Sequence, residues 1–221
     1  GRAIWVLDNV APLREISVEV AGEAVHLFAP ATAVRLRGNQ NKDTPLPPEE
    51  PVAQNPPAGA MIDYWLAADA AGPVTVTIRD AGGKIVRTFD SASTEEPLKA
   101  DRYFAERWIR PGPSVSSKAG AQRFVWDLRA RRPHVAEYEY SIAAVDGVNT
   151  PLLPQGMLVP PGNYQVTLAA GGRELVQPLR VIADPRVPLE AAASADAWSL
   201  YGDVAEVLER QTVAIAELGA V

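Results

Sequence analysis

Proline is the residue that most limits what this chain can fold into. There are 20 prolines among 221 residues, about 9%, which is nearly twice the usual share of ~5%. Each one lacks a backbone N–H and fixes φ, so proline interrupts helices and is confined to turns and strand edges. The longest stretch without proline follows Pro188. The sequence therefore predicts many short strands joined by turns, followed by one helix.

The overall composition narrows the classes of partner. Hydrophobic residues make up 47% and charged residues 22%, which is ordinary for a folded globular domain. The formal net charge of −6 opposes binding to nucleic acids or to an anionic bilayer. The sequence has no cysteine and no apolar run of the ~18 residues needed to span a membrane. We expect no nucleic-acid partner, no membrane insertion and no cofactor.

Alternating apolar and polar residues predict strands through the middle of the chain. The clearest pair is 74–79 and 84–89, which flank Asp80-Ala81-Gly82-Gly83, because glycine accepts the positive φ of a tight hairpin turn. Further strand candidates are 60–67, 122–128, 164–168 and 174–182, and Gly171-Gly172 is predicted to form the turn between the last two. Pro178 indicates that the last of these lies at a sheet edge or contains a bulge. The spacing predicts a mainly β fold, a sandwich of two sheets.

The ends of the chain differ from this middle region. Arg2–Leu7 resembles a strand that continues from a preceding domain, and 24–37 is one extended run on either side of Pro30. The predicted organisation is an N-terminal portion 1–37, a proline-rich linker 38–59, a sandwich 60–183 with insertions at 91–120 and 130–159, and a helical portion 184–221. Within the first insertion, 100–108 is a candidate short helix that ends before Pro111.

The last predicted element is an amphipathic helix over 194–218. Its apolar residues recur at three- and four-residue spacing. They are Trp198, Tyr201, Val204, Val207, Leu208, Ile215 and Leu218. Such a stripe more often covers a sheet than seals a dimer. We expect the helix to pack on the sandwich, and a homodimer through this helix is the alternative.

Several motifs resemble those of a known family. Gly1–Leu13 is similar to the strand that closes the last blade of large bacterial propeller proteins with BNR-like, sortilin-like repeats, which are often labelled glycosyl hydrolases. Three segments resemble the Ig-like domain of the flagellar hook-capping protein: the hairpin 74–89, Arg123–Arg129 and Pro160–Val166. Gln122 stands where the second of these motifs usually has asparagine. The resemblance covers most of residues 1–18 and 60–183.

The resemblance implies an Ig-like antiparallel β-sandwich preceded by a propeller-derived strand. It also implies a non-catalytic accessory module of a larger exported protein, extracellular or periplasmic, that caps or orients the preceding propeller and binds a carbohydrate or protein ligand. The alternative is a part of a glycoside hydrolase whose catalytic site lies in that propeller. Because a fold does not fix a function, these are expectations about context rather than chemistry.

Catalytic side chains are sparse in the sequence. His26 and His134 are the only histidines, and they show no spacing typical of zinc ligands. A serine hydrolase needs a histidine beside its nucleophile, and Gly112–Ser116 lacks the second glycine of a nucleophile elbow. Glu137 and Glu139 would share one face of a strand about 7 Å apart, as glycosidase carboxylates can, but an exposed solvated strand explains them more simply. We expect no catalytic and no metal-binding residue.

Aromatic residues in the two insertions are the best candidates for ligand binding. Exposed aromatic rings stack on the CH-rich faces of sugars, and binding residues gather in long loops. The candidate carbohydrate-stacking residues are Tyr103, Phe104, Trp108, Tyr138 and Tyr140. Insertions of this length must also bury side chains to be ordered, so packing is the competing role for these rings.

The remaining notable side chains are expected to be structural. Asp127 is predicted to pair with Arg123 or Arg129. The basic cluster predicted to lie in a solvated loop is Arg129, Arg131 and Arg132. The tryptophans predicted to lie in the core are Trp5, Trp65 and Trp126.

Overall fold

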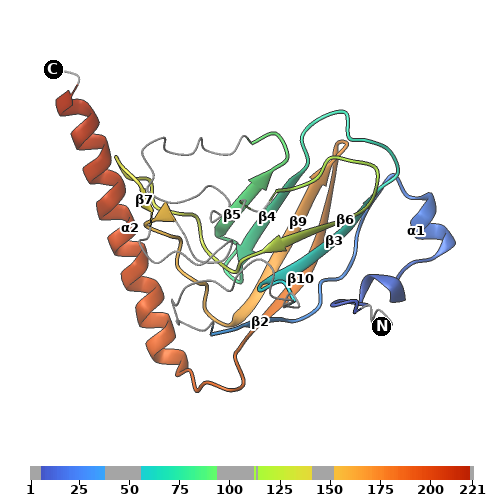
Figure 1. Ribbon diagram of the computed structural model, residues 1–221, viewed down its shortest axis with the longest axis horizontal. Coiled ribbons are helices and arrows are strands. Elements are labelled where there is room, and N and C mark those ends of the chain that lie inside the picture. Colours follow the sequence, from blue (N-terminus) through green and yellow to red (C-terminus); the bar gives the residue numbers. More distant parts are fainter. Residues whose placement is uncertain (1–5, 38–55, 94–111, 113, 141–151, 220–221) are drawn as a thin grey trace, which may run out of the picture.

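A computed structural model describes residues 6–37, 56–93, 112, 114–140 and 152–219. Within these ranges the fold is mainly β, as predicted, with ten strands and one long helix (Figure 1). The strands are β1 (Val25–Leu27), β2 (Ala33–Arg35), β3 (Ala60–Leu66), β4 (Thr75–Asp80), β5 (Ile85–Asp90), β6 (Gly120–Trp126), β7 (Glu139–Tyr140), β8 (Leu152–Leu153), β9 (Gly162–Ala170) and β10 (Arg173–Ala183). The helical elements are η1 (Pro12–Arg14), α1 (Val18–Gly22) and α2 (Ala191–Gly219).

The strands form two main sheets that share one apolar interior. One sheet has the order β1-β3-β6 and the other the order β2-β10-β9-β4-β5, while β7 and β8 form a separate pair. Alternate residues of each strand point inward, for example Ile62 and Tyr64 in β3 and Val166 and Leu168 in β9. Trp126, at the end of β6, is fully buried at the centre of this interior.

Both predicted glycine hairpins are present. Gly83 has φ of +81° in the turn between β4 and β5, and the Asp80 carboxylate accepts the backbone N–H groups of Gly82 and Lys84, each at 2.9 Å. Gly171 and Gly172 have φ of +56° and +74° in the turn between β9 and β10. A two-residue turn with positive φ at both positions matches the twist of the strands it joins.

The extended run predicted over 24–37 is not one strand but two. β1 pairs antiparallel with β3, whereas β2 pairs with β10 in the other sheet. The chain changes sheets around Pro30, which has no N–H to donate to a ladder. The pairing of β2 with β10 is parallel, so the expectation of a purely antiparallel arrangement is wrong at this edge.

Pro178 lies in a part of β10 that forms a sheet edge, which is one of the two positions predicted from the sequence. Over Arg173–Arg180, β9 is the one strand that pairs with β10 in the described part of the chain. β2 joins only at Val181–Ala183. Proline is tolerated at this point because its missing N–H does not face a neighbouring ladder.

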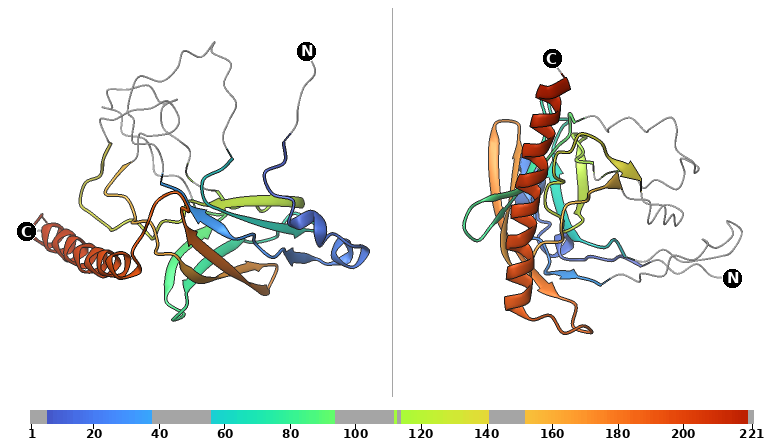
Figure 2. Two further views of the ribbon diagram at one scale, coloured as in Figure 1. Left: turned by 90° about the horizontal axis from the view of Figure 1, so that it is seen from below. Right: turned by 90° about the vertical axis from the view of Figure 1, so that its left-hand side faces the viewer.

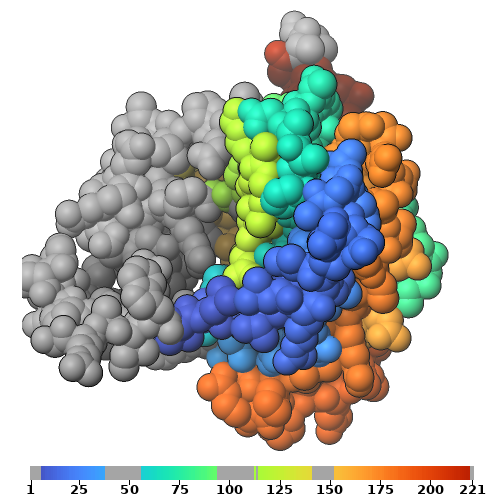
Figure 3. Space-filling view, turned by 90° about the vertical axis from the view of Figure 1, so that its right-hand side faces the viewer, coloured from blue at the N-terminus to red at the C-terminus, as the bar shows by residue number. Residues whose placement is uncertain are grey.

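The N-terminal residues differ from their prediction. Residues 1–5, including Trp5, lie outside the described residues, and Val6 and Leu7 do not belong to a strand. The chain instead forms η1 and α1. Ser17 is the N-cap of α1, and its hydroxyl accepts a hydrogen bond from the N–H of Val20 at 3.3 Å. Figure 3 shows residues 6–37 lying against β3 and β6.

The predicted C-terminal helix is present as α2. It lies at the opposite end of the molecule from α1, along one side of the sheets (Figures 1 and 2). Trp198 and Tyr201 pack against the apolar interior, as expected. Four other members of the predicted stripe do not, because Val204, Val207, Ile215 and Leu218 are each about half exposed or more. In the described residues no helix is long and apolar enough to cross a membrane.

The predicted insertions are described only in part. Most of the linker 38–59 and the candidate helix 100–108 lie outside the described residues. At the end of the first insertion, Val115 is buried, and β6 begins at Gly120 rather than at Gln122. Trp65 faces away from the interior and is only partly buried, so its predicted core position is wrong.

Two buried tyrosines hydrogen-bond to backbone carbonyls. Tyr64 donates to the Ser116 carbonyl at 2.6 Å, and Tyr164 donates to the Pro160 carbonyl at 2.6 Å. Burial raises the pKa of each of these phenols to about 12. The neutral hydroxyl is therefore the form that the folded state favours.

A first prediction concerns stability at high pH. The folded-state pKa of Tyr164 lies above the value of ~10 in unfolded chains, so its contribution is complete below pH 10 and is lost between pH 10 and 12. We expect Tyr164→Phe to lose about 1 kcal/mol at neutral pH and to show a shallower decline above pH 10. Urea denaturation across this pH range measures both effects. Tyr138→Phe is the control, and identical slopes for Tyr164→Phe and the unmodified chain would contradict the prediction.

A second prediction concerns Gly59, which precedes β3. Its φ is +140°, and a Cβ atom there would lie 2.1 Å from the backbone oxygen of Trp126. We expect Gly59→Ala to reduce the free energy of unfolding by more than about 2 kcal/mol. Gly72→Ala is the control, because nothing lies within 4 Å of the corresponding Cβ position. Equal denaturation midpoints for the two variants would show that the close approach does not matter.

Candidate functional site at the helix junction

The described part of the predicted aromatic platform lies in the bridging segment, which we define as Arg129–Tyr140. It follows β6 and ends with β7. One of its sides contacts the strands. The backbone N–H of Arg131 donates to the Val86 carbonyl of β5 at 3.2 Å, and that of Ala130 donates to the Met157 carbonyl at 2.9 Å. Ala130 and Pro133 are buried. The segment is therefore packed onto the body of the fold.

The other side of the bridging segment contacts α2. The Tyr201 hydroxyl donates to the Arg131 carbonyl at 2.8 Å, and the Thr212 hydroxyl lies 3.3 Å from the His134 carbonyl. The Glu209 carboxylate accepts the N–H of His134 and pairs with the Arg131 guanidinium. Partial burial acts to raise the pKa of Glu209, but the two hydrogen bonds and the attraction to the charges of Arg131 and His134 together outweigh it and hold the pKa below its usual value.

The two described members of the platform are only partly available to a ligand. Tyr138 is half-buried, its hydroxyl donates to the Pro133 carbonyl at 2.9 Å, and the Arg132 guanidinium lies over its ring, 4.3 Å from the centroid. Tyr140 is half-buried in β7 opposite Leu152. One ring face of Tyr138 is thus occupied by a cation of the same segment. The other three members, Tyr103, Phe104 and Trp108, lie outside the described residues, so the platform as a whole stays a prediction.

The partner predicted for Asp127 is wrong. Asp127 accepts the guanidinium of Arg87 in β5 at 3.1 Å, and it also accepts the backbone N–H of Arg129 at 3.1 Å. The Arg129 side chain instead donates to the Gly156 carbonyl at 2.8 Å. Burial lowers the pKa of Arg129, and the nearby Arg87 and Arg35 act in the same direction while Asp127 opposes them. The predicted solvated position is therefore wrong for Arg129, which is half-buried, whereas the Arg131 side chain is 64% exposed and pairs with Glu209 at the surface.

A second polar cluster ties the N-terminal residues to the smaller sheet. Asp63 of β3 accepts Nε of Arg123 at 2.7 Å and the side-chain amide of Asn9 at 3.1 Å. Arg123 lies directly opposite Asp63 on β6. The Asp63 side chain is 10% exposed, so its charge is largely removed from water and depends on these partners.

A third polar contact lies between β10 and α2. The Asp184 carboxylate accepts the side chain of Arg186 at 2.7 Å and the backbone N–H of Arg37 at 3.1 Å. These hydrogen bonds, led by the one from Arg186, lower the pKa of Asp184. The contact fixes the end of β2 beside the start of the connection to α2.

The candidate catalytic side chains do not come together. His26 is half-buried in β1 and its Nδ1 lies 3.0 Å from Glu23, whereas His134 lies beside α2. Glu137 and Glu139 are exposed, and β7 begins only at Glu139, so they do not share a strand. Among the described residues, no group of three or more histidines and carboxylates is placed to hold a metal ion.

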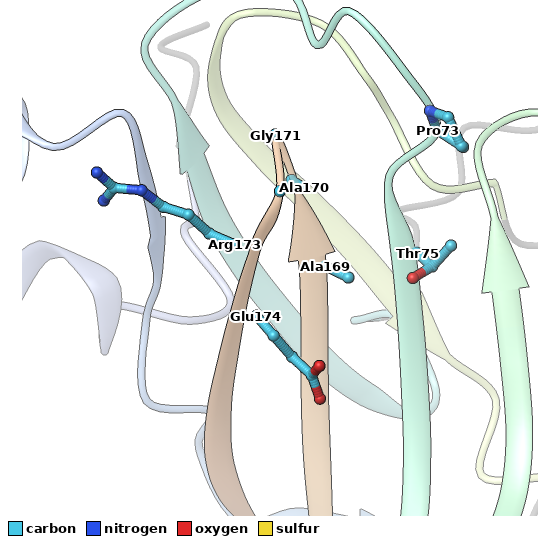
Figure 4. Close-up of a pocket in the computed structure, with 8 residues that line it drawn as sticks. Pro73, Thr75, Ala169, Ala170, Gly171, Arg173 and Glu174 are labelled. Atoms are coloured by element: carbon cyan, nitrogen blue, oxygen red, sulfur yellow. The ribbon is translucent and has the colours of Figure 1, made fainter.

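A shallow depression lies at the tip of the β9–β10 hairpin (Figure 4). It is lined by Pro73, Thr75, Ala169, Ala170, Gly171, Gly172, Arg173 and Glu174. Figure 4 shows that Arg173 points away from Thr75, so the one cation of this set does not face the depression. Small apolar side chains and one carboxylate provide no acid–base pair, and we assign no chemistry to this surface.

Sequence reasoning named some of the residues that make these contacts, among them Asp127, Arg123 and Arg131, but it did not pair them correctly and it missed Asp63, Arg87 and Glu209. Asp63 could have been noticed, because a carboxylate within an apolar strand must have a partner to remain charged. Arg87 and Glu209 gave no such signal. Each occupies a polar position that a solvated surface would explain equally well.

Comparison of the chain with family models, with curated proteins and with solved structures found no match. The function must therefore be argued from the contacts described above.

A third prediction concerns the coupling between Asp63 and Arg123. Their side chains are 10% and 31% exposed, so we expect a double-mutant cycle with alanine to give a coupling free energy of about 1–3 kcal/mol. The control cycle uses Asp69 and Lys118, whose side chains are 58% and 74% exposed and should couple by less than about 1 kcal/mol. Urea denaturation gives both values. Equal coupling in the two pairs would contradict the assigned role.

Proposed function

We propose that this chain is a non-catalytic accessory module with an Ig-like fold, which holds the segments before and after it in fixed positions on one rigid β body. The proposal rests on the contacts of the charged side chains, which fasten the N-terminal residues and α2 to the sheets. Asp63 and Arg123 engage the N-terminal residues, and Arg131 engages α2 through Glu209. These groups form structural ties rather than a constellation of nucleophile, base and acid.

The strand order supports an Ig-like arrangement. The order β1-β3-β6 corresponds to strands A, B and E, and the order β10-β9-β4-β5 corresponds to G, F, C and C′. β2 adds to G, so the first strand is divided between the two sheets. The chain departs from antibody domains because it has no cysteine to link strands B and F.

The position of Tyr164 supports the same arrangement. It lies near the start of β9, the strand that corresponds to F, and its hydroxyl donates to the carbonyl four residues upstream. This is the geometry of the tyrosine corner found in Ig-like domains. The Trp126 ring packs edge-on against Tyr164, with ring centroids 5.8 Å apart.

The resemblance to modules that follow bacterial propellers gives the proposal its context. The preceding segment would be the end of a propeller in an exported protein, and the clamp formed by Asn9, Asp63 and Arg123 would fix the angle at which the two domains meet. In the alternative context the propeller is a glycoside hydrolase and this module only positions it. Glycan binding by the aromatic platform belongs to the same proposal, with Tyr138 offering the ring face that Arg132 does not cover.

A fourth prediction tests the positioning role. The chain has no cysteine, so spin labels can be placed at Leu13→Cys in η1 and Val213→Cys in α2, both more than half exposed. We expect one narrow distance distribution between the labels, because both ends are tied to the same sheets. Asp63→Ala should broaden it by releasing η1. Electron–electron double resonance measures the distribution.

The matched control for this experiment is Asp69→Ala, which removes an exposed carboxylate whose partner is Lys118 and should leave the distribution unchanged. A broad distribution in the chain without Asp63→Ala would overturn the positioning role. Turnover of aryl glycosides by the purified chain would overturn its non-catalytic part.

A further inference from the structure

α2 carries a second apolar face that no described element of the fold covers. Its docked face is formed by residues that contact the body, including Trp198, Tyr201 and Thr212. A different set of α2 residues is exposed along the whole helix. This set, which we call the seam, is Ala197, Leu200, Val204, Val207, Gln211, Ala214 and Leu218. Figure 2 shows α2 at one side of the sheets rather than between them.

The spacing of the seam is that of a coiled coil. Its members alternate intervals of three and four residues from Ala197 to Leu218, just over three heptads. A stripe with this spacing stays on one side of a helix and accepts the side chains of a second helix between its own. Leu200 is 63% exposed and Leu218 is 78% exposed, so the seam leaves large apolar side chains in water.

The flank of the seam indicates the charge of its partner. Asp196, Asp203, Arg210 and Glu217 recur every seven residues along the side away from the body, and all four are exposed. The other side carries Tyr201, which packs against the body, the half-buried Leu208 and the exposed Ile215. The free flank therefore presents three carboxylates and one guanidinium to any helix that lies on the seam.

The charges on this flank do not favour pairing between two copies of the chain. In the antiparallel register that overlaps the two seams along their full length, Asp203 lies opposite Arg210 and Asp196 lies opposite Glu217, so each attraction is matched by a repulsion. Parallel pairing places the charged flank against the apolar side of the other copy. A membrane surface also fits poorly, because helices that bind anionic lipid carry basic residues beside the apolar face.

We propose that the seam of α2 binds an amphipathic α-helix of another segment or protein, with apolar residues at heptad spacing and lysine or arginine along the flank that meets Asp196, Asp203 and Glu217. Burying the seam removes its exposed apolar side chains from water, and the acidic flank selects a basic helix over an acidic one. This inference does not depend on the accessory role proposed above.

The probe for a fifth prediction is a fluorescent peptide of about four heptads with leucine at the seam positions and lysine at both flanks. Its counterpart carries glutamate at the flanks, and like charges keep either peptide from pairing with itself. We expect fluorescence anisotropy at physiological salt to show saturable binding of the lysine peptide, at least tenfold tighter than that of the glutamate peptide.

The matched variants are Val207→Asn in the seam and Val213→Asn outside it, since the two valines are 52% and 56% exposed. Val207→Asn should weaken binding at least tenfold and Val213→Asn should leave it unchanged, with circular dichroism confirming that both remain folded. Equal effects of the two variants, equal binding of the two peptides, or no binding would overturn the proposal. Dimerisation of the chain alone that Val207→Asn abolishes would also overturn it, because the occupant would then be a second copy.

Discussion

The burial of alternate side chains between two sheets is the interaction on which the rest of the structure depends. Trp126, Tyr64 and Phe124 from one sheet meet Val166 and Leu168 from the other, and all are almost completely buried. At ~25 cal/mol for each Å² of apolar surface removed from water, burial of this kind is the largest favourable contribution to the stability of a domain of this size. Everything outside this interior, including both helices, is attached to it by a smaller number of contacts.

Local signals predicted the parts of the fold that are decided locally. Each hairpin turn needs positive φ at positions where the sequence has glycine, so Gly83, Gly171 and Gly172 were sufficient to place the turns. The division of 24–37 between two sheets was not predictable in this way. Alternation shows which residues face inward, but it is the same whichever sheet a strand joins. Pro30 marked the break without showing that the chain changes partner there.

The pairing of charged side chains at the candidate site could not be predicted from local signals either. Asp127 pairs with Arg87, which is 40 residues earlier in the chain, because β5 and the end of β6 meet across the interior. Sequence proximity favoured Arg123 and Arg129, yet Arg123 faces Asp63 on the neighbouring strand and Arg129 reaches the Gly156 carbonyl. Which carboxylate meets which guanidinium follows from strand register, and register depends on the whole sheet.

The rotation of α2 about its own axis shows why amphipathic patterns need a structure to be interpreted. A hydrophobic stripe was expected to face the sheets, but the helix docks largely through hydrogen bonds to the bridging segment, made by Tyr201, Thr212 and Glu209. Each such bond stabilises by only about 1 kcal/mol, but it has a fixed direction, whereas apolar burial has none. Directional contacts therefore set the rotation and turn Leu200, Val204 and Val207 toward solvent. The apolar residues of α2 therefore occupy more than one side of the helix, and only the side with Trp198 and Tyr201 packs against the apolar interior among the described residues.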